Sequence, residues 1–427
     1  MRAICGINRL RGIMATPPSL IHGTWSRPVT GLAALSLFSM GLAQFWELPL
    51  AATRHGGIAF FGAFLLCLLL LALPLRLLEL MLGRRSRRSP IDGMAYLTRE
   101  ADAPRGWRAA AWGSGLADVM AIAGLALLAG WGGSFLGHRF VSEAVQTATA
   151  AGLVWPVGTG TAFILAAGLS LLRAGQRELA NTLALAVVVI CLGVAALLGA
   201  SFPGAYDTVT TLGADGWREA MRFALLAGGG GLGVVWLTGM HLPKETALGS
   251  FTLALVSLQA VLAGLVWLAL APYVPAAVGA AGSSAVLEQI PTAMGAGLAP
   301  VLLFVALGLA AVFALAFAAE PLLVRLAEKG ISRLPAVVLV FVSGSALAEM
   351  LWMGGRVEGV HFLLQAVRDL LLLVMLGMAV FAGWIMKISH ARKELNLPNE
   401  GIYNVWRVAV RIVVPLAVLF VFSGYLA

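Results

Sequence analysis

Long apolar stretches alternate with short polar or charged stretches along most of the chain. Each apolar stretch is close to the roughly 20 residues that an α-helix needs to cross a bilayer, and there are about eleven of them. They lie at residues 28–50, 57–82, 109–136, 154–172, 180–201, 217–240, 247–271, 296–326, 334–353, 360–388 and 405–426. The pattern therefore predicts an all-α polytopic membrane protein.

The composition agrees with this pattern, since 60% of the 427 residues are hydrophobic and only 11% are charged. A soluble domain usually carries about a quarter charged residues. The first 24 residues hold several arginines but no continuous apolar run, which is typical of a tail rather than a signal peptide. We expect a cytoplasmic tail at 1–24 and one transmembrane bundle over 25–427.

Lysine and arginine gather in four loops, each of which follows an even-numbered apolar stretch. These residues are Arg84, Arg85, Arg87 and Arg88; Arg173 and Arg177; Lys329 and Arg333; and Lys387, Arg392 and Lys393. All four loops lie on one side of the membrane if the N-terminus is cytoplasmic, as the positive-inside rule prefers. The net charge of +9 then reflects topology, so we expect the lipid bilayer as a partner and not nucleic acid.

Residue types that carry catalysis or bind metals are sparse. The three cysteines, Cys5, Cys67 and Cys191, offer neither a disulfide framework nor metal-ligand spacing. No phosphate-binding loop or HExxH motif occurs, and no nucleophile and base converge within the apolar stretches. We therefore expect no enzyme, no cofactor and no metal centre.

Two of the apolar stretches are interrupted. The first contains GLAQFWELP, in which Pro49 closely follows the charged Glu47, and the sixth contains four glycines at 228–231. A glycine inside a helix costs about 1 kcal/mol relative to alanine. Small residues also serve close helix packing, but four in a row surround the helix, so unwinding is the favoured interpretation. Two breaks five stretches apart predict an inverted repeat of 5+5 helices, with unwound helices 1 and 6 and one extra C-terminal helix.

Several motifs occur in the same order as in one family of transporters. GLAQFWELP at 41–49 is similar to GLGNxWRFP, HGGIAF at 55–60 to NGGGAF, and LPLRLLELMLGR at 73–84 to IPLxxxExxxGR. ALLAGGGGLGVVWLTGMHLPK at 224–244 aligns without gaps on AFFSLSLGMGxxxTYGSYLPK. The chain thus resembles a divergent member of the neurotransmitter:sodium symporter family, whose fold is that of the bacterial leucine transporter.

The resemblance implies a secondary transporter in the bacterial inner (plasma) membrane, with a small organic solute of amino-acid type bound between helices 1 and 6. The residues expected to line that site are Phe38, Ser39, Gly41, Gln44, Leu125, Leu226, Gly228 and Gly229. Leu125 replaces a tyrosine whose hydroxyl binds the substrate carboxylate in the family, and Leu226 replaces an aromatic lid.

The sodium-binding positions of the family lack suitable side chains in this chain. They fall on Gln44, Ala227 and Val256 for the first sodium, and on Phe313 and Ala314 for the second. No serine or threonine occurs between residues 301 and 321. We therefore expect that the sodium sites are lost. The alternative function is a non-transporting sensor or accessory protein that derives from the same fold.

An extracellular gate of the family is altered as well. Its arginine on helix 1 becomes Glu47, and its acidic partner on helix 10 falls near Leu363. Arg222, His361 and Arg368 are the candidate cations for Glu47, unless this carboxylate lies in a water-filled vestibule.

Glu79 matches a helix-2 glutamate of the family. The resemblance implies that it binds backbone groups freed by the break in helix 1. Arg76 lies three residues earlier, so the two side chains can pair on one helix face.

Overall fold

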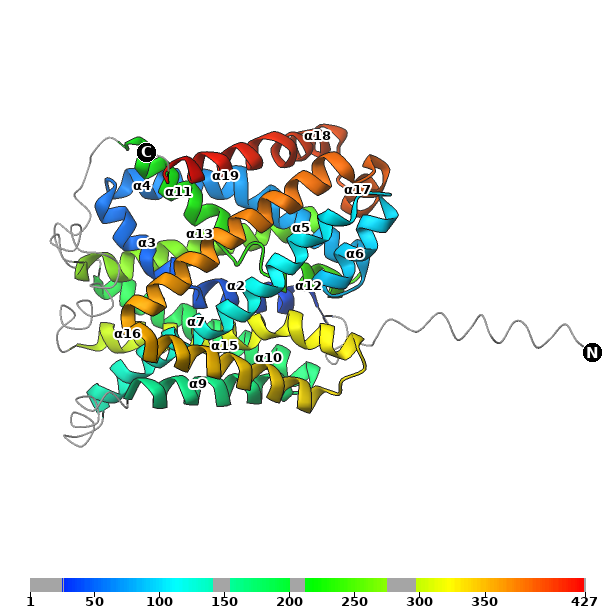
Figure 1. The fold of residues 1–427 in the computed structure, drawn as a ribbon. Coiled ribbons are helices and arrows are strands. Elements are labelled where there is room, and N and C mark those ends of the chain that lie inside the picture. The colour runs from blue at the N-terminus through cyan, green and yellow to red at the C-terminus, as the bar shows by residue number, and fades with distance from the viewer. Residues whose placement is uncertain (1–24, 26, 141–153, 200–211, 275–296, 426–427) are drawn as a thin grey trace, which may run out of the picture.

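Helices account for the described chain apart from short connections, and no strand occurs within it (Figure 1). The computed structural model describes residues 25, 27–140, 154–199, 212–274 and 297–425, so the expected tail at 1–24 lies outside its scope. Within these ranges, the side chains of residues 43–46, 131–140, 154–156 and 352–361 are not described.

The helices follow one another without domain boundaries. Up to residue 199 they are α2 (Pro28–Gly41), α3 (Ala43–Arg54), α4 (Ile58–Cys67), η1 (Leu68–Ala72), α5 (Leu73–Ser86), α6 (Pro90–Glu100), η2 (Arg105–Arg108), α7 (Ala109–Phe140), α9 (Val154–Leu171) and α10 (Ala174–Gly199). From residue 214 they are α11 (Ala214–Leu226), α12 (Gly233–His241), α13 (Leu248–Leu270), η3 (Ala271–Tyr273), α15 (Leu298–Glu328), α16 (Arg333–Val380), η5 (Phe381–Ile385), α17 (Ile388–Leu395), α18 (Glu400–Val408), η6 (Ala409–Val413) and α19 (Val414–Ser423).

Many of these helices are long and apolar enough to cross a membrane. Within the described ranges, eight stretches qualify: Ile58–Ser86, Arg105–Gly130, Ala174–Gly199, Leu248–Tyr273, Leu298–Glu328, Arg333–Leu351, Phe362–Ile385 and Glu400–Ser423. Two shorter apolar helices cover Pro28–Gly41 and Val157–Leu171. All of them overlap expected segments, which confirms the all-α polytopic architecture. The expected segment 217–240 is missing from this set because a break divides it into α11 and α12, of 13 and 9 residues.

The ninth and tenth expected segments, 334–353 and 360–388, are joined in the structure. The ninth segment and the first part of the tenth belong to α16, a single helix of 48 residues, and the tenth continues through η5. In Figure 1 the gold first part and the orange last part of α16 run in different directions from the left-hand side of the view. Gly354 and Gly355 lie between the two parts, and glycine weakens a helix at such a change of direction.

Helices 1 and 6 are both unwound, as the sequence predicts. The helix α2 ends at Gly41, Leu42 is extended with φ −78° and ψ 139°, and α3 begins one residue later. Between α11 and α12, Gly228, Gly229 and Gly231 have φ values of +73°, +69° and +79°. Only glycine adopts these left-handed angles without steric strain, so the glycine run is what allows the chain to leave the helix here.

The two broken helices lie inside the bundle. The helix α2 packs against α15, α10 and α13, while α12 packs chiefly against α5. All nine residues of α12 are buried. Exposed backbone groups at a break are costly in lipid, and this burial keeps both breaks surrounded by protein.

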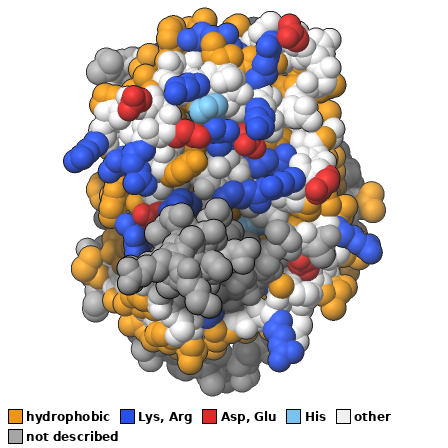
Figure 2. Space-filling model, turned by 90° about the vertical axis from the view of Figure 1, so that its right-hand side faces the viewer, with side chains coloured by type: hydrophobic (Ala, Val, Ile, Leu, Met, Phe, Trp, Pro, Cys, Tyr) orange, Lys and Arg blue, Asp and Glu red, His pale blue; other side chains and the backbone are white. Residues whose placement is uncertain are grey.

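One end of the bundle is rich in charged side chains. Figure 2 shows many Lys and Arg side chains, with Asp and Glu among them, on the face at the right-hand side of Figure 1. Arg84 and Arg85 stand in the last turn of α5, and Arg392 and Lys393 in the last turn of α17. This end agrees with the shared side that the basic loops predict.

Gly231→Ala should lower the melting temperature of the purified protein. An L-residue at φ +79° is strained by about 1–3 kcal/mol, and the new methyl group would lie 3.1 Å from the Leu371 carbonyl oxygen. Gly193→Ala in α10 is the matched control, because its methyl group would meet nothing within 4 Å. Alanine there should raise stability slightly. Equal melting temperatures for the two variants would show that the break is not strained.

Candidate functional site

The breaks in helices 1 and 6 meet at a side chain from α13. Gln259 is buried, and its amide nitrogen Nε2 donates a hydrogen bond of 2.8 Å to Ser39 Oγ beside the helix-1 break. Ser39 Oγ in turn donates to the Leu35 carbonyl oxygen at 2.7 Å. A Cβ atom at Gly228 would lie 2.2 Å from Gln259 Nε2 and 3.2 Å from Ser39 Oγ. The two breaks are therefore neighbours in the centre of the bundle.

Each glycine of the run lets a different group approach the backbone. Gly228 is approached by Gln259, as above, and a Cβ atom at Gly229 would lie 2.2 Å from a ring carbon of Phe38. At Gly230 it would lie 2.3 Å from Nη1 of Arg76. Any larger residue at these three positions would displace its neighbour, so the run is needed for close approach as well as for backbone conformation.

A buried ion pair holds the helix-6 break. Arg76 and Glu79 on α5 are 0% and 1% exposed, and their side chains are joined by a contact of 3.0 Å. Arg76 Nε donates to the Ala227 carbonyl oxygen at 3.1 Å and Nη2 to that of Leu225 at 2.8 Å; Nη2 also bonds Ala227. Glu79 accepts from the Gly231 backbone N–H at 3.0 Å. Besides Arg76, Glu79 thus bonds the break in helix 6, and among the described residues it has no hydrogen bond to the helix-1 break that the resemblance implied.

A second carboxylate meets the start of α12. Asp118 on α7 is buried, and its Oδ1 accepts from the Gly233 backbone N–H at 3.3 Å. The first N–H groups of a helix lack partners within the helix and carry a partial positive charge. Asp118 therefore occupies the position at α12 where an anion would otherwise bind.

The expected substrate-lining side chains that the structure describes are buried in the protein. Phe38 and Ser39 are 0% exposed, and Leu125 and Leu226 are each 3% exposed. The Phe38 ring lies against Gly229, so an aromatic side chain already occupies part of the space between the breaks. The side chain of Gln44 lies outside the described part of the structure.

The second expected sodium position is closely packed. A Cβ atom at Gly41 would lie 2.3 Å from the Ala314 Cβ atom and 2.5 Å from the Ala310 carbonyl oxygen. Phe313 is 7% exposed and Ala314 is fully buried. At this contact α2 and α15 thus meet through small residues without side-chain oxygens.

Gln259 is the polar residue that the sequence interpretation missed. The expectation placed the helix-7 sodium position at Val256, which is buried, but the side chain that reaches the breaks is one turn further on. Gln259 is the one amide side chain within the sequence of α13, and that isolation in an apolar helix was the available signal. Its Oε1 has no hydrogen-bond partner among the described residues.

The altered gate forms an ion pair. Arg368 Nη2 of α16 lies 2.5 Å from Glu47 Oε1, with side chains 10% and 23% exposed. Arg222, a second candidate, pairs with Glu219 on its own helix at 2.6 Å. The side chain of His361, the third candidate, lies outside the described part. The structure thus brings Arg368 to the carboxylate.

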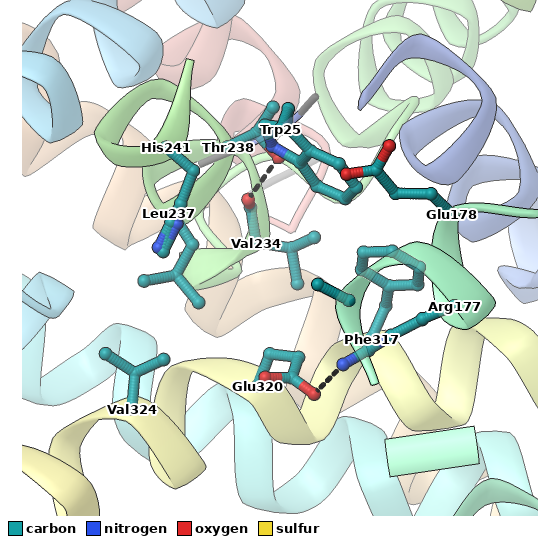
Figure 3. Close-up of a pocket in the computed structure, with 11 residues that line it drawn as sticks. Trp25, Arg177, Glu178, Val234, Leu237, Thr238, His241, Phe317, Glu320 and Val324 are labelled. Atoms are coloured by element: carbon teal, nitrogen blue, oxygen red, sulfur yellow. Dashed lines mark hydrogen bonds and ion pairs between the residues drawn. The ribbon is translucent and has the colours of Figure 1, made fainter. Parts of the chain in front are cut away.

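A hollow lies between α10, α12 and α15, and the sequence did not indicate it. It encloses about 560 Å³, including space open to solvent, and is shown in Figure 3. Its lining residues are Trp25, Ala174, Arg177, Glu178, Val234, Leu237, Thr238, His241, Phe317, Glu320 and Val324.

An ion-pair cluster borders this hollow. Glu320 bonds Arg177, as Figure 3 shows, and lies 2.6 Å from Nη2 of Arg333. Arg333 Nη2 also donates to the Ser170 carbonyl oxygen at 2.8 Å, and Trp25 stacks on Phe317 with ring centroids 6.5 Å apart. The cluster links α9, α10, α15 and α16 beside the start of α2.

No family model matches the chain. Local similarity to curated proteins is nevertheless clear. Over 72 residues the chain is 37% identical to a sodium-dependent acetylcholine transporter of Caenorhabditis elegans, which covers 17% of this chain and 10% of that protein. Over 108 residues it is 32% identical to the uncharacterized sodium-dependent transporter YhdH of Bacillus subtilis, covering 25% and 23%.

A third relative is the sodium-dependent neutral amino acid transporter B(0)AT2 of Pongo abelii, at 34% identity over 74 residues, or 17% of this chain and 10% of that protein. The matched parts thus span less than a quarter of each of these three relatives. All are named as transporters rather than enzymes, which supports the expectation that this chain is not an enzyme.

The whole architecture is matched by a solved structure. The crystal structure of MhsT in complex with L-phenylalanine superposes with a TM-score of 0.79 at 19% identity, covering 93% of this chain and 98% of MhsT. The chain therefore has the leucine-transporter fold, and its divergent resemblance to the neurotransmitter:sodium symporter family is confirmed.

Proposed function

We propose that the chain is a secondary transporter that binds a small organic solute between the breaks in helices 1 and 6. The observation that carries this proposal is the meeting of the two breaks, at Ser39, Gln259 and Gly228, inside the bundle. Unwound segments at such a place offer backbone groups to a solute. The proposed setting is the bacterial inner membrane, with the N-terminus and the hollow of Figure 3 on the cytoplasmic side.

The chemistry around the breaks favours a mostly apolar solute. Phe38, Leu125 and Leu226 supply apolar surface, and Ser39 and Gln259 supply the polar groups. Asp118 already accepts a hydrogen bond from a backbone N–H in the first turn of α12. An anionic group of the solute would therefore bind at the N-terminus of α3 instead. L-Phenylalanine bound to MhsT is a solute of this type.

The alternative is a non-transporting sensor or accessory protein. The observation that favours it is the closed packing at the breaks, where Phe38 lies against Gly229 and Ala314 lies against Gly41. A sensor needs only to bind the solute, whereas a transporter must also expose it to both sides of the membrane.

Uptake by proteoliposomes distinguishes the two functions. A thermal-shift screen of the purified chain against amino acids and amines first identifies a ligand, and we expect an apolar amino acid to raise the melting temperature. A transporter should then accumulate the labelled ligand inside the vesicles. Ser39→Val should weaken both binding and uptake, because it removes the hydroxyl group that accepts from Gln259. Binding with no uptake would establish the sensor instead.

Sodium should stabilise the protein no more than potassium or choline does. Ala227, Phe313 and Ala314 lack the side-chain oxygens that the resemblance expects at the sodium sites, and the backbone carbonyl oxygen of Ala227 already bonds Arg76. A ligand that binds only the folded state adds about 2.7 kcal/mol at a hundredfold excess over its Kd. Melting temperatures in the three chloride salts at equal ionic strength measure this, and a rise specific to sodium would contradict the loss of the sites.

The pair of Glu47 and Arg368 is proposed to close the extracellular side. Glu47→Gln keeps nearly the same volume but removes the ionic attraction, so a cysteine placed at Ser39 should react faster with a membrane-impermeant thiol reagent. The double variant Glu47→Arg with Arg368→Glu should restore protection, because it exchanges the two charges. Glu219→Gln is the matched control, since it breaks an ion pair within α11 alone. Identical rates in all four proteins would show that the pair does not act as a gate.

A further inference from the structure

We propose that the guanidinium of Arg76 is a built-in cation at the helix-6 break, in the position that a dissociable cation would otherwise occupy. The break then keeps its geometry without any bound metal ion. This inference goes beyond the proposed function, because it holds whether or not the chain moves a solute.

The C-terminal end of α11 requires a donor or a cation. The last carbonyl groups of a helix have no partner within the helix and carry the negative end of its dipole. Here Leu225 and Ala227 present such carbonyl oxygens in a region without solvent exposure. Arg76 Nη2 lies 2.8 Å from the Leu225 oxygen, and Nε lies 3.1 Å from the Ala227 oxygen. One fully buried side chain thus satisfies both groups.

On the α12 side of the break, carboxylates accept hydrogen bonds from the free backbone N–H groups. Gly231 donates its N–H to Glu79 Oε1 at 3.0 Å, and Gly233 donates to Asp118 Oδ1 at 3.3 Å. Positive charge therefore stands at the C-terminal end of α11, and negative charge at the N-terminal end of α12. Both ends of the break are satisfied by charges that belong to the chain itself.

The glycine run makes room for this cation. A Cβ atom at Gly230 would lie 2.3 Å from Nη1 of Arg76 and 2.6 Å from Nη2. The guanidinium can reach the carbonyl groups of α11 only because this position carries no side chain. Its planar fork also bonds Glu79 at 3.0 Å, so the donors of one group serve three partners at once.

A tethered cation differs from a dissolved one because it is present at every salt concentration. While Arg76 is present, the stability of the protein should therefore not depend on which monovalent cation is in solution. Once the guanidinium is removed, the carbonyl groups should recruit a cation from solution, and a free guanidinium ion matches the vacated space best.

The test is the melting temperature of the purified full-length Arg76→Met variant in sodium, potassium and choline chloride, with and without millimolar guanidinium chloride. Methionine keeps the apolar stem as far as the position of Nε, and it removes the charged end of the guanidinium, which leaves space for a free ion. We expect the variant to melt at least about 5 °C below the wild type in choline chloride. Millimolar guanidinium should recover part of that loss, while the wild type should respond to none of the ions.

Arg84→Met is the matched control, because Arg84 is also a buried arginine of α5 that donates to backbone carbonyl groups. Its partners, Pro243 and Thr246, are half-buried in a loop, where water can replace the lost donors. This variant should lose stability without recovery by guanidinium. The double variant Arg76→Met with Glu79→Gln removes the uncompensated carboxylate and serves if the single variant does not fold; it should show the same guanidinium response.

Two outcomes would overturn the proposal. One is an Arg76→Met variant as stable as the wild type in every salt, which would make Arg76 only a partner of Glu79. The other is equal recovery by guanidinium in the Arg76→Met and Arg84→Met proteins, which would show a general effect of the ion rather than a site at the break.

Discussion

Backbone polar groups that leave a helix inside a membrane must find partners within the protein, and this requirement governs the centre of the molecule. Helix 6 is broken by four consecutive glycines, which frees carbonyl groups on one side and N–H groups on the other. Arg76 bonds the former, and Glu79 and Asp118 bond the latter. The helices that carry these three side chains, α5 and α7, both pack against α12.

Around the breaks, this chain has apolar contacts at positions where the family resemblance expects ion ligands. Where the family resemblance expects hydroxyl ligands, this chain has Ala227, Phe313 and Ala314, and the last of these lies directly against Gly41. Charge persists at the two ends of the bundle, in the pair of Glu47 with Arg368 and in the cluster around Glu320. The molecule thus combines ionic ends with a centre whose charged side chains bond one another or the backbone of helix 6.

The sequence was sufficient to predict the all-α polytopic architecture and both breaks, because apolar length, glycine and proline act locally. It was less informative wherever the answer depended on helix rotation. Val256 and Gln259 differ by one turn of α13, and only packing decides that Gln259 meets Ser39. The hollow of Figure 3 could not be predicted, since its lining comes from Trp25, which precedes α2, and from α10, α12 and α15, far apart in the chain. Likewise, the resemblance assigned Glu79 to the break in helix 1, whereas the structure bonds it to Gly231 at the break in helix 6.

The close approach of Arg76 to Gly230 restricts how this sequence can change over time. A residue with a side chain at position 230 is tolerable only after the arginine has gone, and loss of the arginine first leaves Glu79 without its cationic partner. Either order of substitution passes through a protein of lower stability, so a change at one of the two positions depends on the residue at the other. Homologues should therefore carry both residues or neither, and this pairing would mark the branch in which helix 6 became independent of external ions.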